Sequence, residues 1–123
     1  EIHAKRRINK ANLDGIFEKV DGLRTINELE ESETSWFGVP IVCRDKKQKT
    51  ALVKHLEDNR VQTRNYFAGN ILQHPGYRHL GDASKYPNAN QVLDKVFFVG
   101  CSPTITEEMI EYVDSVVMSF NNE

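Results

Sequence analysis

The chain has 123 residues, of which 16 are Lys or Arg and 18 are Asp or Glu, so its formal net charge is −2, and 39% of its residues are hydrophobic. This length predicts a single domain, residues 1–123, with a core of its own. The near-neutral charge disfavours nucleic acid and membrane as partners, because both require a concentrated basic surface. No apolar run approaches the ~18 residues of a membrane span, and the first residues lack the pattern of a secretory signal.

The chain has two cysteines, Cys43 and Cys101, which lie far apart in the sequence without a second Cys or His at metal-ligand spacing. They are predicted to be small buried residues of a protein in a reducing compartment, with no metal site. The sequence opens on Glu1 in a helical pattern rather than on Met. We therefore expect it to begin inside a longer protein.

Apolar residues recur at helical spacing near the start of the chain: Ile8, Leu13, Ile16, Phe17 and Val20. This spacing predicts a helix up to Val20, and the Asp21-Gly22 pair can end it because glycine readily adopts the left-handed conformation. The basic run Lys5-Arg6-Arg7 is expected on the exposed face of this helix. Residues 24–34, which are rich in glutamate, are expected to form an exposed connection.

Residues 36–43, WFGVPIVC, are too few for a helix and rich in aromatic and β-branched side chains, which predicts a strand. Pro40 cannot donate a backbone hydrogen bond, so we expect an edge strand or a bulged one. Asp45 and Gln48 have the spacing of a capping box, which predicts a helix through about Asp58. One face of this helix is expected to hold Ala51, Leu52, His55 and Leu56.

Residues 61–67 alternate as a half-buried strand does, and residues 95–101 are almost all apolar, as in a central strand. Between them, residues 68–91 contain several Gly and Pro and are expected to form a long loop, of the kind that often carries function. Thr106, followed by two glutamates, is expected to cap a last helix through Phe120. The core stripe of that helix is expected to comprise Met109, Ile110, Val113, Val116, Val117 and Phe120.

The expected order is therefore helix, strand, helix, strand, strand, helix. A strand–helix–strand unit followed by a strand that inserts between the first two gives a small three-stranded mixed or antiparallel sheet, covered by helices on one face. The predicted fold class is α+β.

Side chains suited to a polar, anionic ligand concentrate in residues 63–77, which run from a predicted strand into the long loop. The segment holds Arg64, Asn65, Asn70, His74 and three aromatic residues. A guanidinium binds phosphate or carboxylate, amides bind hydroxyls, and aromatic rings pack on sugars or bases. The same histidine and tyrosines can equally be ordinary loop and packing residues, so their types alone leave the site open. The chain has no phosphate-binding glycine loop, nucleophile elbow or helical His pair.

Residues 63–75 contain the string Arg-x-x-Phe-Ala-Gly-Asn, with Pro75 after it, and residues 97–109 read FFVGCSPTITEEM. Both segments resemble the C-terminal part of the DegT/StrS-type sugar aminotransferase family. Within that family the string resembles the nucleotide-sugar 3-dehydratases, which act on CDP-4-dehydro-6-deoxyglucose or GDP-4-dehydro-6-deoxymannose. The resemblance implies a cytoplasmic, homodimeric enzyme that uses pyridoxal or pyridoxamine phosphate to make a deoxysugar nucleotide for lipopolysaccharide O-antigen.

The resemblance further implies a fold-type-I enzyme of two domains, in which residues 1–123 are the small C-terminal domain and the large cofactor-binding domain is absent. The Schiff-base lysine, or the histidine that replaces it in the dehydratases, belongs to the large domain. We therefore expect no catalytic residue here, no cofactor bound by this chain alone, and no activity of the isolated chain. The cysteines are too few for an iron–sulfur cluster.

Carried over by position, the resemblance assigns substrate binding to Arg64, Phe67 and Asn70, with an anionic or hydroxyl contact for Arg64 and a sugar contact for Asn70. Phe67 stands where the aminotransferases commonly have Tyr. Leu72 stands where they commonly have His, which counts against transamination. His74 stands where the dehydratases more often have Gln, so its role is left open.

Three alternatives remain at this stage. A 4-aminotransferase of the same family would be distinguished by a Lys in place of a His at the cofactor position of the large domain. A free-standing α+β module that binds a small metabolite would require a reading frame that starts near Glu1, whereas the two-domain enzyme requires about 250 more residues before it. Nucleic-acid binding through Lys5-Arg6-Arg7 and Arg64 is disfavoured by the net charge.

Overall fold

The computed structural model describes residues 1–120. Its helices and strands are, in chain order, α1 (Ile2–Phe17), β1 (Arg24–Thr25), β2 (Gly38–Val42), α2 (Lys46–Asp58), β3 (Thr63–Asn65), the 3-10 helices η1 (Ile71–Gln73), η2 (Pro75–Leu80) and η3 (Ala83–Lys85), then α3 (Pro87–Lys95), β4 (Val96–Gly100) and α4 (Glu107–Met118). The strands form an antiparallel sheet in the order β1-β2-β4-β3. The predicted α+β class is confirmed, and so is the insertion of the last strand between two earlier ones.

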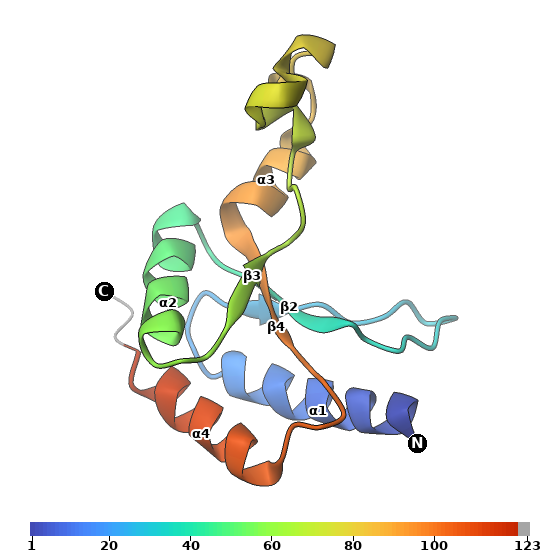
Figure 1. Ribbon diagram of the computed structural model, residues 1–123, viewed down its shortest axis with the longest axis vertical. Helices are drawn as coiled ribbons and strands as arrows, with labels where there is room; N and C mark the ends of the chain where they lie inside the picture. The colour runs from blue at the N-terminus through green and yellow to red at the C-terminus, as the bar shows by residue number, and fades with distance from the viewer. Residues whose placement is uncertain (121–123) are drawn as a thin grey trace.

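Helices α1, α2 and α4 gather on one side of the molecule, whereas α3 and the short helices project away from the sheet (Figure 1). The ring of Phe17 in α1 meets that of Phe97 in β4 edge-on, with centroids 6.4 Å apart. Paired residues of antiparallel strands point to the same face, so Ile41, the partner of Phe97, also faces these helices. The buried core further includes Leu13, Leu52, Leu56, Val99 and Val117. Each such burial stabilises the fold by about 1.5–3 kcal/mol.

The other face of the sheet, which we call the second face, is defined by the same pairing. Phe98 pairs with Pro40 on one side and with Arg64 on the other. At the end of the sheet where β1 pairs with β2, Val42 is the partner of both Arg24 and Val96. These residues therefore share the face that points away from the helical core.

The sheet has four strands where three were predicted, because β1 is only two residues long and carries no periodicity that a sequence pattern could reveal. Its pairing with Ile41 and Val42 places β2 inside the sheet, which corrects the expected edge strand. Pro40 nevertheless lies beyond the end of β1, so its missing N–H costs no bond to that strand.

The long loop predicted over residues 68–91 is largely helical, since it contains three 3-10 helices and the start of α3. Pro87 occupies the first turn of α3, where its fixed φ is favourable. Both predicted helix caps are confirmed: Asp45 accepts from the Gln48 N–H at 2.8 Å, and the hydroxyl of Thr106 accepts from the Met109 N–H at 3.2 Å.

Three predicted core positions are wrong. Ile8, Ala51 and Met109 are exposed, because each lies at the margin of its helix's apolar stripe rather than at its centre. The helix predicted to reach Val20 ends at Phe17. Among the described residues, no helix has both the length and the apolar character that a bilayer span requires.

Candidate functional site

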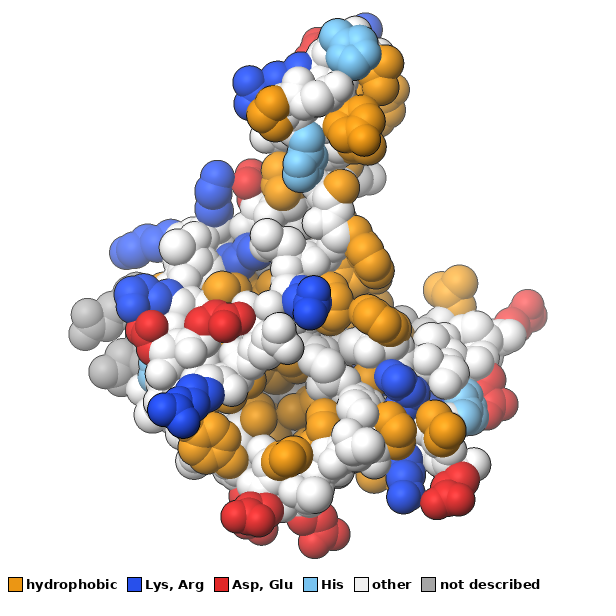
Figure 2. Space-filling model, in the orientation of Figure 1, with side chains coloured by type: hydrophobic (Ala, Val, Ile, Leu, Met, Phe, Trp, Pro, Cys, Tyr) orange, Lys and Arg blue, Asp and Glu red, His pale blue; other side chains and the backbone are white. Residues whose placement is uncertain are grey.

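Four aromatic side chains gather on the second face where β3 ends: Phe37, Tyr66, Phe67 and Phe98, here called the aromatic cluster. The Phe67 ring stacks on Phe98, with centroids 6.0 Å apart and 29° between planes. Tyr66 meets both rings edge-on, and Phe37 lies 5.7 Å from Phe98. Phe98 is buried beneath them, whereas 71% of Phe37 and 72% of Phe67 is exposed. Hydrophobic side chains, drawn in orange, are exposed between the sheet and the projecting helices (Figure 2). Exposed rings grouped as in the aromatic cluster mark a binding surface or an interface.

The cluster depends on a sharp turn after β3. Phe67 has a φ of 51° and Gly69 a φ of 62°, both in the left-handed region. The Phe67 N–H donates to the Asn65 carbonyl at 2.7 Å, and the Gly69 N–H donates to that of Tyr66 at 3.2 Å. A bulky residue with positive φ is strained, and strain of this kind persists mostly where function requires it.

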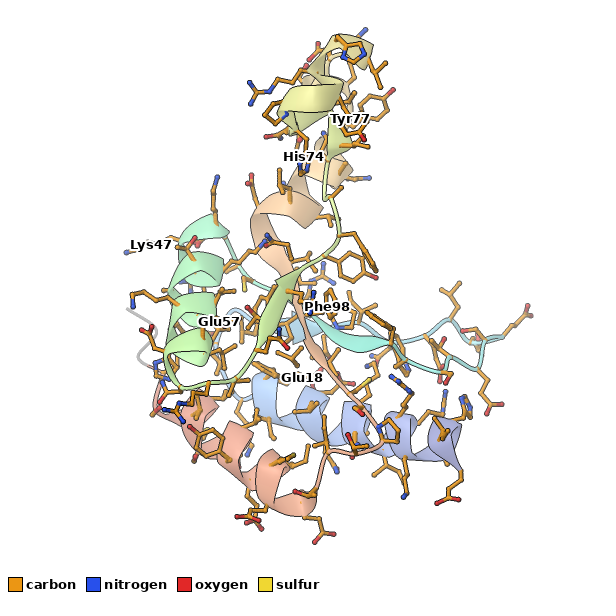
Figure 3. The ribbon with its side chains drawn as sticks, in the orientation of Figure 1. Glu18, Lys47, Glu57, His74, Tyr77 and Phe98 are labelled. Carbon is orange, nitrogen blue, oxygen red and sulfur yellow. The ribbon has the colours of Figure 1, made fainter. Side chains whose placement is uncertain are left out.

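Arg64 reaches the same surface from β3, where it is the cross-strand partner of Phe98. It borders a cavity of about 650 Å³ together with Phe37, Asn65, Phe67 and Phe98. Within residues 1–120, its guanidinium makes no hydrogen bond or ion pair. The structure therefore brings Arg64 and Phe67 together and leaves the guanidinium available to an anion. The short helices and α3, residues 71–95, form the part of the chain that we call the projecting segment. In Figure 3, Phe98 lies near the centre of the sheet, and His74 and Tyr77 lie on the projecting segment above it.

Asn70 has a different environment from the other two predicted site residues. It is 3% exposed, and its Oδ1 accepts from the Leu72 N–H at 3.0 Å. Its Nδ2 donates to Asn90 Oδ1 at 2.8 Å and to the Ala83 carbonyl at 3.3 Å. The amide thus connects the start of η1 to α3. Asn70 also borders another cavity, of about 620 Å³, which Phe67 lines as well.

His74 also stabilises this loop, because its Nε2 donates a hydrogen bond to the Ala68 carbonyl at 2.8 Å. This bond closes the segment between the turn at Phe67 and the first short helix.

Sequence reasoning missed Phe37 and Phe98 as site residues, because both were assigned only to strands. One signal was present in the sequence: Phe97 and Phe98 are consecutive in a strand, so their rings must point to opposite faces. If Phe97 fills the core, Phe98 must face away from it.

The two buried lysines of the described chain, Lys10 and Lys49, do not fit the role of a Schiff-base lysine, because their amines are engaged within the fold. Lys10 pairs with Asp14 on the same helix and lies 4.2 Å from the centre of the Trp36 ring. Lys49 donates to the Leu93 carbonyl at 2.8 Å, and burial lowers its pKa.

The cysteines are free and buried, as predicted. Burial raises the pKa of Cys43 to about 12 and also raises that of Cys101, so neither is a reactive thiolate. The residues that the structure describes contain no group of three or more His, Cys, Asp or Glu side chains able to hold a metal ion.

The α+β fold of this chain recurs in solved structures of sugar aminotransferases and dehydratases. An Escherichia coli GDP-4-keto-6-deoxy-D-mannose-3-dehydratase with bound hydrated PLP superposes with a TM-score of 0.75 and 23% identity, over 93% of this chain and 30% of that one. The model of the DegT/DnrJ/EryC1/StrS aminotransferase family matches residues 1–118, and the chain belongs to this family. The resemblance seen in the sequence is thereby confirmed.

Two curated relatives match nearly all of the chain. A lipopolysaccharide biosynthesis protein RfbH of Salmonella typhimurium is 30% identical over an alignment of 128 positions, which covers 98% of this chain and 29% of the relative. A dTDP-4-dehydro-2,6-dideoxy-D-glucose 3-dehydratase of Saccharopolyspora spinosa is 34% identical over an alignment of 119 positions, which covers 94% of this chain and 26% of the relative. The chain thus spans less than a third of the length of either.

Proposed function

We propose that this chain is the C-terminal small domain of a nucleotide-sugar 3-dehydratase of deoxysugar and lipopolysaccharide biosynthesis, and that its second face forms one wall of the sugar-nucleotide cleft. The observation that carries the proposal is the unpaired guanidinium of Arg64 beside the exposed ring of Phe67. The relative named as a 3-dehydratase supports the reaction. The short span of the chain relative to its relatives supports the assignment as a domain.

In this proposal Arg64 binds an anionic or hydroxyl group of the substrate, and the Phe67 ring packs against the apolar face of the sugar or base. Phe37 extends the same surface. Asn70 contributes by holding the loop that presents Phe67, because its amide is already bonded to η1 and α3. The direct sugar contact expected of Asn70 stays a prediction, and it would require exchange of these bonds.

The cofactor, pyridoxal or pyridoxamine phosphate, would be held by residues outside 1–123 in a cytoplasmic homodimer. Support comes from the short span of the chain relative to its relatives and from the buried lysines Lys10 and Lys49, whose amines are engaged within the fold. We expect the isolated chain to be inactive. On mixing with pyridoxal phosphate, the isolated chain should leave the cofactor's absorption spectrum unchanged, and a stoichiometric shift of the absorption band would contradict the proposal.

The decisive test begins with the coding sequence upstream of Glu1, which we expect to encode roughly 250 further residues. A His at the cofactor position would favour the dehydratase, and a Lys would favour a 4-aminotransferase of the same family. A reading frame that starts near Glu1 would instead favour a free-standing metabolite-binding module.

In the complete enzyme, Arg64→Gln should raise KM for the nucleotide sugar about tenfold, because one charge-assisted hydrogen bond is lost. Arg78→Gln, which removes a cation from the projecting segment, serves as the matched control and should leave KM unchanged. Equal kinetics for Arg64→Gln and the unmodified enzyme would overturn the placement of the cleft on this face.

A further inference from the structure

A second concave site lies at the corner where β1, β2 and β4 meet α3. It is a pocket of about 680 Å³, within the range of about 300–1,000 Å³ typical of small-molecule sites. Its polar lining consists of three cations and two amides: Arg24, Arg44, Lys95, Asn88 and Gln91. Among the described residues that line it, none is acidic. We call it the basic pocket.

Two of its cations lack partners in the fold. Within residues 1–120, the side chains of Arg24 and Lys95 form no hydrogen bond or ion pair. Arg44 forms two long ion pairs, at 3.8 Å to Asp21 and at 3.5 Å to Asp45. The side chains of both aspartates are at least half exposed. Charges without an internal partner are available to a ligand.

Among the described cations of the pocket, Asp21 and Asp45 pair with Arg44, and neither aspartate lines the pocket. Asp45 caps α2 by accepting from the Gln48 N–H, and this bond lowers its pKa. Asp94, the neighbour of Lys95, pairs with Lys46 at 3.5 Å. The pocket therefore keeps a net positive lining although the chain as a whole is slightly acidic.

The pocket also has an apolar lining. Val42 and Val96 come from the sheet, and Val92 comes from α3. Apolar neighbours limit the solvation of a bound charge and strengthen its interaction with the cations of the pocket. Amide N–H groups from Asn88 and Gln91 add neutral donors for the remaining oxygens of a tetrahedral anion.

We propose that the basic pocket binds a phosphate or diphosphate group. Guanidinium and ammonium groups with added amide donors are the set that recognises phosphoryl oxygens. The basic pocket and the aromatic cluster are distinct, but both lie on the second face of the sheet. Arg24 pairs with Val42 and Phe98 pairs with Pro40, and these two residues of β2 point to the same face. Since the pocket lies wholly within this chain, the proposal does not depend on the function proposed above.

The test is a titration of the 123-residue chain with inorganic pyrophosphate, followed by amide NMR. We expect saturable shifts in the amide signals of Leu23, Arg24, Arg44 and Gln91, weakened by added salt. Arg24→Gln and Lys95→Gln should each raise Kd about tenfold, since each removes one charge-assisted contact. Two variants are used so that misfolding of either leaves the other informative.

Lys47→Gln is the matched control, because Lys47 is an exposed cation at the start of α2 that does not line the pocket (Figure 3). It should leave Kd unchanged. Two outcomes would overturn the proposal: an equal loss of affinity in Lys47→Gln, or amide shifts that never saturate. Either would mean that pyrophosphate is attracted by the overall positive charge of the region and not bound in the pocket. Absence of shifts at these four amides would overturn it outright.

A parallel titration with UDP and CDP distinguishes the sources of the phosphate group. Tighter binding of a nucleotide than of pyrophosphate, with the same amides shifted, would support the proposal and identify a nucleoside diphosphate as the occupant. Equal affinities would support a site for the phosphoryl group alone. Nucleotide binding that shifts only residues of the aromatic cluster would count against the basic pocket.

Discussion

Phe67 folds back onto Phe98, so that the two rings stack 6.0 Å apart on the face of the sheet opposite the helical core. The contact is possible because the backbone at Phe67 is left-handed, with a φ of 51°, directly after the last residues of β3. A regular continuation of the strand would carry the ring away from Phe98. The surface that we assign to the sugar nucleotide is therefore built by one unfavourable backbone angle.

This strain makes a first prediction at Phe67 itself. Both Phe67→Ala and Phe67→Gly remove the ring, but only glycine adopts a positive φ without steric cost. We expect Phe67→Gly to be more stable than Phe67→Ala by about 1 kcal/mol in urea unfolding followed by circular dichroism. If the alanine variant proves the more stable of the two, the backbone at this position is not strained.

A second prediction concerns Gly69, two residues further along. A Cβ at this position would lie 2.6 Å from the Cβ of Leu93 and 2.7 Å from its Cα, and the φ is 62°. Gly69→Ala should therefore lower the free energy of unfolding by about 2–4 kcal/mol through overpacking and backbone strain together. Gly76→Ala is the control, because a Cβ there meets no heavy atom within 4 Å. A loss of similar size in both variants would contradict the close packing of the turn on α3.

The elements that could be predicted from sequence are those determined by local spacing. Asp45 and Thr106 each lie three residues before the N–H that they cap, so both helix starts are visible in the sequence. The aromatic cluster was not visible, because Phe37 and Phe67 meet Phe98 only through strand register and a turn. The resemblance predicted Arg64, Phe67 and Asn70 as site residues, but the burial of Asn70 is a tertiary property that no motif contains.

Asn70 supplies a third prediction. Asn70→Ala removes three hydrogen bonds and leaves the side chain of Asn90 and the carbonyl of Ala83 with fewer partners, so the free energy of unfolding should fall by about 2–3 kcal/mol. Asn12→Ala, an exposed position in α1, should be neutral or slightly stabilising. A fully stable Asn70→Ala whose complete enzyme binds sugar nucleotide weakly would instead favour the direct sugar contact.

The fourth prediction concerns acid stability. The Arg7 guanidinium and the Thr34 N–H lower the pKa of Glu28 from 4.5 to about 2. Because the folded state holds this carboxyl ionised, its stabilising effect is complete above about pH 4.5 and is lost as the pH falls toward about 2. Glu28→Gln should flatten the fall of Tm across this range. Glu30→Gln, exposed in the same segment, should keep the slope of the unmodified chain.

Thiol reactivity provides the fifth prediction and reports on the same fold. Cys43 is 2% exposed, Cys101 is fully buried, and burial raises the pKa of both thiols, that of Cys43 to about 12. Only the thiolate attacks a disulfide reagent, so at pH 8 the folded chain should stay unmodified over the time in which the urea-unfolded chain reacts completely. Because reaction requires transient opening, the destabilised Gly69→Ala should be modified faster than Gly76→Ala. A thiol that reacts in native buffer as fast as in urea would mean that it is accessible in the folded chain.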